Sequence, residues 1–126
     1  MNLVLQKPVL AICWLAADAP VPGWATDQST FFSLTRTADE LSVVCAASLV
    51  PPEVKHEGGW RAFKVDGPLE FGLTGVLASI LAPFAAARIS IFAVSTFDTD
   101  YVLIKAGRLE EACRVLGAAG HTIRDA

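Results

Sequence analysis

The apolar positions of residues 73–84 follow the repeat of an amphipathic helix. Large apolar side chains fall at 73, 76, 77, 80, 81 and 84, which is the spacing of one helical face. The opposite face carries small residues in place of charges, namely Ala78, Ala82, Ala85 and Ala86. We therefore predict a helix that packs its broad apolar face into a core, and we expect a further surface to cover its alanine side.

Two short strands joined by an acidic turn follow this helix. Residues 89–95 and 101–104 are rich in β-branched and aromatic side chains, and Phe97-Asp98-Thr99-Asp100 lies between them. Two such runs predict an antiparallel hairpin. An alternating strand over 60–66 comes before the helix, and a second amphipathic helix over 108–116 and a closing strand at 121–123 come after the hairpin. This βαββαβ order predicts a ferredoxin-like unit with two helices on one face of its sheet.

The first half of the chain predicts the same strand order with its helices reduced. Residues 9–15 form a continuous apolar run typical of a central strand, and residues 31–36 and 41–45 predict a hairpin. Proline and glycine leave room for only single turns near 22–25 and 46–49, and Gly58-Gly59 predicts a loop. The predicted fold class is α+β, with two ferredoxin-like units in tandem and antiparallel sheets. The shortened unit covers 1–59 and the complete one covers 60–126.

The composition of the chain excludes some classes of binding partner. The 126 residues are 53% apolar and carry a formal charge of −3, and the ten basic residues are scattered. This argues against a nucleic-acid surface, which needs clustered lysine and arginine. Residues 76–94 are apolar enough to be tested as a membrane span, but Arg88, Pro83 and the change of period exclude one, and no signal-peptide pattern is present. We expect a cytoplasmic protein without a membrane or nucleic-acid partner, and its low charge content favours self-association.

The spacing of the cysteines and histidines bears on catalysis and metal binding. Cys13, Cys45 and Cys113 lack the paired spacing of metal or redox motifs, so we interpret them as buried, reduced thiols. His56 and His121 have no carboxylate spaced to orient them, and we interpret both as surface histidines. No nucleophile elbow or phosphate-binding loop occurs. The sequence therefore predicts a protein that is not an enzyme and has no cofactor and no metal.

A small-molecule site is predicted where the helix of residues 73–84 begins. The first backbone amides of a helix lack internal partners and suit a carboxylate, and the fold brings the acidic turn to the same corner, where a carboxylate can hold an ammonium. The candidate ligand-binding residues are Thr74, Gly75, Val76, Thr96, Phe97, Asp98 and Asp100. From the residues alone two alternatives stay open: Thr74 serves only as a helix N-cap, or the aspartates merely form the turn.

Three segments carry a resemblance to a known family. Residues 73–80, 87–91 and 95–101 resemble the ACT domain, a small regulatory module that senses amino acids, and the whole chain is similar to tandem ACT proteins related to the CASTOR arginine sensors. The resemblance implies a non-catalytic sensor that binds an amino acid or a similar zwitterion at an interface between units. Leu73 stands where the arginine sensors have an acid, so arginine is not implied, and Arg88 stands where the family commonly has glycine.

We also expect a homodimer that acts through an unidentified protein partner, because the sequence shows no kinase, dehydrogenase or DNA-binding segment. In that setting Gly75, Thr96, Phe97 and Asp100 are the positions that best match the family's ligand site. The main alternative is a constitutive dimerisation module with a vestigial ligand site. An RNA-binding sheet of the same topology is a weaker alternative, because the acidic balance of the chain counts against it.

Overall fold

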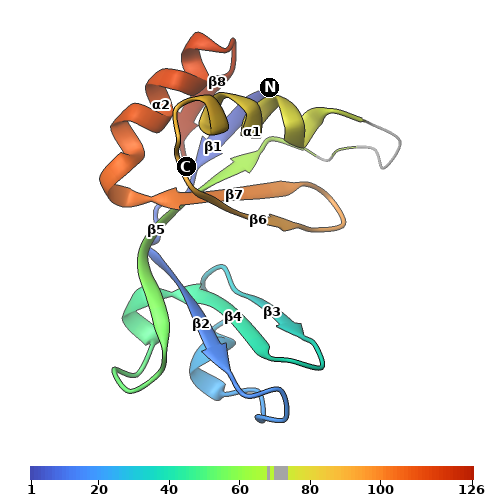
Figure 1. Cartoon of the computed structure of the whole chain (residues 1–126), viewed down its shortest axis with the longest axis vertical. Coiled ribbons are helices and arrows are strands. Elements are labelled where there is room, and N and C mark those ends of the chain that lie inside the picture. The colour runs from blue at the N-terminus through green and yellow to red at the C-terminus, as the bar shows by residue number, and fades with distance from the viewer. Residues whose placement is uncertain (68, 70–73) are drawn as a thin grey trace. The chain divides into compact units, whose positions relative to one another are not determined.

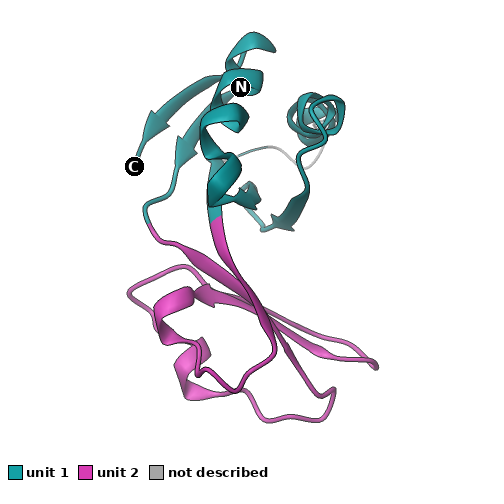
Figure 2. Ribbon diagram, turned by 60° about the vertical axis from the view of Figure 1, so that its left-hand side comes forward, with its two compact units in different colours: residues 1–7, 61–126 teal, residues 8–60 magenta. Residues whose placement is uncertain are grey.

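The computed structural model of the chain describes residues 1–67, 69 and 74–126. These residues form two compact units (Figure 2): unit 1 contains residues 1–7 and 61–126, and unit 2 contains residues 8–60. Both predicted hairpins and both predicted full helices form within these ranges (Figure 1). Pro68 and Leu73, which the sequence places in a turn and at the start of a helix, lie outside the described residues.

Unit 1 confirms the predicted βαββαβ order. Its elements are the second half of β5 (His56–Val65), α1 (Val76–Ala86), β6 (Ile91–Ser95), β7 (Asp100–Lys105), the short 3-10 turn η3 (Ala106–Arg108), α2 (Leu109–Ala118) and β8 (Thr122–Asp125). Strand β6 pairs antiparallel with β7, and β7 also pairs with β5. The hairpin that carries the acidic turn is therefore joined to the strand that precedes α1.

A strand that the sequence analysis missed completes the sheet of unit 1. Strand β1 (Asn2–Leu5) lies between β5 and β8, antiparallel to the first and parallel to the second. The prediction of purely antiparallel sheets is wrong for this β1–β8 pair. Leu3 and Leu5 are buried in the core. Residues 1–7 therefore group with residues 61–126 in one compact unit, whereas the sequence predicts units of 1–59 and 60–126. Three apolar residues in a row give too little periodicity to predict a strand.

Unit 2 confirms the prediction of reduced helices. Its elements are β2 (Leu10–Leu15), η1 (Gly23–Ala25), β3 (Ser33–Arg36), β4 (Leu41–Ala46), η2 (Ala47–Leu49) and the first half of β5. The strand order is β3-β4-β2-β5, and η1 and η2 are single 3-10 turns at the places where the sequence allows only short turns. The buried core of this unit contains Ala11, Cys13, Ala25, Leu41, Val43 and Cys45.

The predicted loop at Gly58-Gly59 is wrong, because both glycines lie inside β5. Leu10 pairs with Trp60 and Ile12 with Glu57, so β5 has one more residue than β2 over this stretch. Such an extra residue is a β-bulge, and Gly59 supplies the left-handed backbone there with φ 75°. The Gly58-Gly59 pair therefore marks a bulge inside a strand, and β5 continues from unit 2 into unit 1.

Helix α1 packs on unit 1 through the apolar face that the sequence predicts. Ile80 and Phe84 are fully buried, and the Phe84 ring lies 6.3 Å from the ring of Phe63 on β5. Ala112 and Leu116 of α2 belong to the same core, so both helices cover one face of the sheet. The alanine face of α1 is exposed: Ala78, Ala82, Ala85 and Ala86. The described part of this chain does not supply the cover that we expected for it.

The carboxyl end of α1 has a left-handed residue that is not glycine. Arg88 has φ 57°, and two hydrogen bonds close the helix around it. The Ile89 amide donates to the Phe84 carbonyl at 2.9 Å, and the Arg88 amide donates to the Ala85 carbonyl at 3.1 Å. These bonds define a Schellman motif, in which a side chain at the left-handed position is strained.

We expect Arg88→Gly to raise the free energy of unfolding by about 0.5–1 kcal/mol, because glycine adopts the left-handed backbone without steric cost. Helix α2 ends in the same motif with glycine at this position, Gly120, at φ 95°. Urea denaturation followed by circular dichroism measures the change. Arg88→Ala is the control, since it removes the guanidinium and keeps the strain. Equal gains from both variants would contradict the backbone explanation.

Candidate functional site

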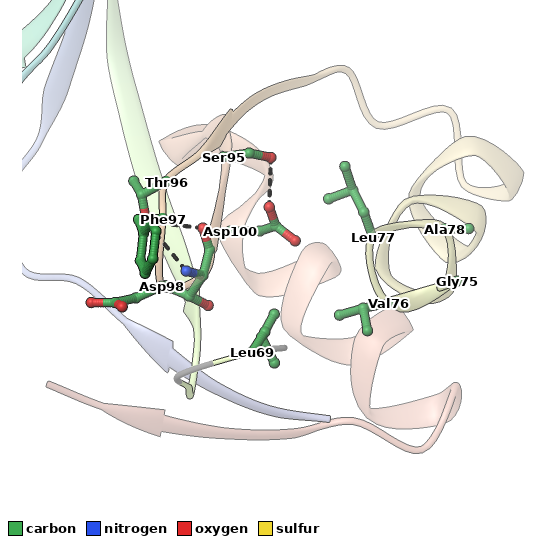
Figure 3. A pocket seen from close by; sticks show the side chains of 11 residues that line it. Leu69, Gly75, Val76, Leu77, Ala78, Ser95, Thr96, Phe97, Asp98 and Asp100 are labelled. Atoms are coloured by element: carbon green, nitrogen blue, oxygen red, sulfur yellow. Dashed lines mark hydrogen bonds between the residues drawn. The ribbon is translucent and has the colours of Figure 1, made fainter. Parts of the chain in front are cut away.

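A cavity of about 350 Å³ lies in unit 1 between the start of α1 and the β6–β7 turn, residues 96–99 (Figure 3). It is lined by Leu69, Gly75, Val76, Leu77, Ala78, Ser95, Thr96, Phe97, Asp98, Thr99 and Asp100. The two features that the sequence predicts to meet therefore face one open space. Of the predicted site residues, Thr74 alone is not part of this lining; it is exposed beside it.

The amino end of α1 lines the cavity through Gly75, Val76, Leu77 and Ala78. Gly75 is the N-cap, with φ 78° and ψ −3°, and no side chain caps the helix. The first bond within the helix runs from the Ser79 amide to the Gly75 carbonyl at 2.9 Å, so the amides of Val76, Leu77 and Ala78 precede it. The alternative in which Thr74 is the N-cap is wrong, because Gly75 occupies that position.

Threonines close the β6–β7 turn. The Thr96 amide donates to the Thr99 carbonyl at 2.8 Å, and the Thr99 amide donates to the Thr96 hydroxyl at 3.2 Å. The buried Thr99 hydroxyl donates to the Val65 carbonyl of β5 at 2.6 Å, which anchors the turn to the sheet. None of these bonds uses an aspartate carboxylate. The Asp100 carboxylate accepts the Ser95 hydroxyl at the base of the hairpin, so the alternative in which the aspartates merely form the turn stays open.

The two aspartates of the hairpin point in different directions. The Ser95 hydroxyl donates to Oδ1 of Asp100 at 2.5 Å, and the Asp100 carboxylate is directed into the space that faces α1 (Figure 3). The Asp98 carboxylate is directed away from α1 (Figure 3), and Asp98 also lines a second hollow together with Lys64. The sequence alone could not predict which carboxylate faces α1, because both aspartates lie in the same short segment between two apolar strands.

Leu69 forms another wall of the cavity, and no pattern in the sequence predicts this. The Leu69 amide donates to the Asp98 carbonyl at 2.7 Å. A Cβ atom on Gly67 would lie 3.1 Å from the Leu69 nitrogen and 3.2 Å from the Asp98 carbonyl oxygen, so glycine permits this close crossing. Leu77, Ala78, Ser95 and Thr99 were also missed as lining residues. A polar Ser95 at the end of an apolar strand is the one sequence signal that points to the cavity.

The remaining candidate groups take structural roles. Burial, with a smaller contribution from the neighbouring Cys45 thiol, raises the pKa of Cys13 to about 12, which keeps this thiol protonated. The three cysteines are free; Cys13 and Cys45 are buried as predicted and Cys113 is half-buried. The prediction that His121 lies on the surface is wrong: it is 9% exposed, and its Nε2 donates to the Ser79 carbonyl at 2.9 Å.

Within residues 1–67, 69 and 74–126, no three histidine, cysteine, aspartate or glutamate side chains gather to hold a metal ion. Over the same ranges, no helix has both the length and the apolar content needed to cross a bilayer.

A family model described as the ACT domain matches residues 55–118, which is just over half of the chain and includes every described residue of the cavity. The chain belongs to the ACT domain family. A second family model, which describes an N-terminal domain, matches residues 9–53. That range lies inside unit 2, while the ACT match covers α1, the β6–β7 hairpin and α2.

Relatives of this ACT protein include a human protein and several solved structures. The human cytosolic arginine sensor for mTORC1 subunit 1 is 38% identical over 109 residues, covering 80% of this chain and 32% of the sensor. A crystal structure of an Agrobacterium tumefaciens protein is 38% identical with a TM-score of 0.93, covering 99% of this chain and 92% of that one.

A more distant structure has the same fold. The regulatory subunit of aspartate kinase from Thermus thermophilus is 13% identical with a TM-score of 0.60, covering 95% of this chain and 98% of that one. The chain spans about a third of the length of the human sensor and 53% of a second human relative. The comparisons therefore establish family and fold for this chain, and they cover only part of the architecture of its human relatives.

Proposed function

We propose that this ACT domain protein is a non-catalytic, cytoplasmic sensor that binds a free amino acid in the cavity of unit 1. The observation that carries the proposal is the open space shared by the uncapped start of α1 and the Asp100 carboxylate. The backbone amides of Val76, Leu77 and Ala78 would donate hydrogen bonds to the α-carboxylate of the ligand, because helix N-termini favour anions. Asp100 would receive the α-ammonium. Together they match a zwitterion.

We further propose that the protein acts as a homodimer and that ligand binding is read by a protein partner. The rim of the cavity carries Phe97, which is 79% exposed, and the alanine face of α1 is exposed as well. Apolar surface of this kind favours contact with a second copy. A ligand that contacts both copies would bind the dimer better than the monomer and shift their association. Light scattering tests the dimer, and a monomer at working concentration would contradict it.

Thermal unfolding in the presence of each of the twenty standard amino acids tests the sensor proposal. A ligand that binds only the folded protein stabilises it by about 2.7 kcal/mol at a hundred-fold excess over its Kd, so at least one amino acid should raise the Tm by several degrees. D-enantiomers of the amino acids that stabilise the protein serve as controls. If no amino acid at millimolar concentration raises the Tm, the alternative of a constitutive dimerisation module with a vestigial site is favoured.

A further inference from the structure

We infer that Pro83 and His121 form a matched pair, in which the imidazole of His121 replaces a helix hydrogen bond that Pro83 removes from α1. The pair makes His121 a positioning residue for the start of α1, which lines the cavity. The pairing itself does not depend on the proposed function, and only its effect on ligand binding rests on that function.

Helix α1 contains a proline that frees one of its carbonyl groups. Pro83 lies inside the helix, which runs from Val76 to Ala86. In an α-helix each carbonyl accepts the amide four positions later, and for Ser79 that position is residue 83. Proline has no backbone N–H, and its ring crowds the carbonyl four residues earlier. The Ser79 carbonyl therefore lacks its usual partner along the helix.

A donor from another element reaches this carbonyl. Nε2 of His121 lies 2.9 Å from the Ser79 carbonyl oxygen. Because a carbonyl oxygen only accepts, Nε2 carries the proton of the neutral ring and Nδ1 keeps a lone pair. Nδ1 lies 3.1 Å from the amino nitrogen of Met1, which can donate to it. Both ring nitrogens thus have partners, as expected of a histidine that is only 9% exposed.

The backbone holds His121 firmly at the end of α2. The His121 amide donates to the Leu116 carbonyl at 3.1 Å and so closes the last turn of that helix. The next amide, that of Thr122, donates to the Met1 carbonyl at 3.0 Å, where β1 and β8 begin to pair. The imidazole is therefore mounted on fixed backbone, and its hydrogen bond to Ser79 ties α1 to the end of α2 and to the β1–β8 pair.

A double-mutant cycle on the full chain tests the pair. His121→Gln can place an amide N–H near the position of Nε2, whereas the side chain in His121→Asn is one methylene shorter and does not reach Ser79. We expect the equilibrium constant of unfolding to be about three- to ten-fold higher for His121→Asn than for His121→Gln, which is the range of one hydrogen bond. In a Pro83→Ala background residue 83 supplies the amide, so the difference should fall below about two-fold. Urea denaturation followed by circular dichroism measures the constants.

Two results of this cycle would overturn the pairing: a similar difference in both backgrounds, or no difference while Pro83 is present. If both His121 variants fail to fold, ¹⁵N NMR of the unaltered chain at about pH 8 decides, because histidine is normally neutral there. The pairing requires the ring proton on Nε2 and none on Nδ1. The opposite tautomer would overturn it.

Isothermal titration with the twenty standard amino acids in turn tests the effect on the cavity. For those that bind, we expect the Kd to be at least about three-fold higher for His121→Asn than for His121→Gln, because a loosened α1 must be ordered again on binding. Equal Kd values would overturn the positioning role of His121 and leave the matched pair standing. Failure of every amino acid to bind the unaltered chain would overturn the proposed function, and the double-mutant cycle would still decide the pair.

Discussion

Asp100→Asn is expected to weaken binding of the stabilising amino acid by about ten- to hundred-fold. Asparagine keeps the size of the side chain and can still accept the Ser95 hydroxyl through its oxygen, so the turn should be preserved. The variant loses the negative charge that would pair with the ligand ammonium. A hydrogen bond to a charged group contributes about 1.5–3 kcal/mol, and about 1.4 kcal/mol corresponds to ten-fold in Kd. Isothermal titration of the full chain measures the loss.

Asp98→Asn is the matched control for this experiment. It removes the same charge from the same turn, but from a carboxylate that is directed away from α1 (Figure 3). We expect its Kd to stay within about three-fold of the original, since an exposed charge that does not contact the ligand acts only weakly through water. Equal losses in both variants would mean that the general negative field of the turn, and not contact with Asp100, supports binding.

Phe84→Ala is expected to lower the free energy of unfolding of unit 1 by about 3–5 kcal/mol, because it opens a large cavity in a packed core. Phe84 is 1% exposed, and with Ile80 it provides the fully buried contacts of α1. Loss of these contacts should also loosen the start of the helix and therefore weaken ligand binding. Urea denaturation followed by far-ultraviolet circular dichroism reports on unit 1, because both α-helices lie there.

Phe97→Ala makes the same chemical change at a side chain that is 79% exposed. Its free energy of unfolding should stay within about 0.5 kcal/mol of the original. Tryptophan fluorescence provides a second probe, since Trp14, Trp24 and Trp60 all belong to unit 2. A Phe84→Ala variant as stable as Phe97→Ala would contradict the packing described for α1.

Long periodic segments were predicted well from the sequence. The apolar stripe of α1 and the paired strands of β6 and β7 carry their own signal, because local periodicity and burial agree there. The missed features depend on distant partners. Strand β1 is four residues long and owes its structure to pairing with β5 and β8, and His121 is buried because α1 presents the Ser79 carbonyl to it.

The sequence was sufficient to predict the two sides of the candidate site, namely the start of α1 and the acidic β6–β7 turn. A glycine before a helix and an acidic turn after the next strand place Gly75 and Asp100 at one corner of any βαββαβ unit. The direction of each carboxylate could not be predicted from the sequence, because the Asp100 side chain is oriented by a hydrogen bond from the Ser95 hydroxyl. The place of Leu69 in the cavity wall could not be predicted either, since it depends on a hydrogen bond from the Leu69 amide to the Asp98 carbonyl. The detailed geometry of the cavity therefore follows from contacts that local patterns do not encode.

The place of β1 in unit 1 has a consequence for how the chain reaches its native state. During synthesis β1 is made early, yet its parallel partner β8 pairs Asn2 with Thr122 and emerges only after everything between them. Unit 2, by contrast, is a continuous segment, residues 8–60, that can complete its own strand pairing first. Contacts so distant along the chain must overcome a large loop-closure entropy and slow the search for the native topology. Unit 1, which contains the cavity, is thus expected to be the later of the two to mature.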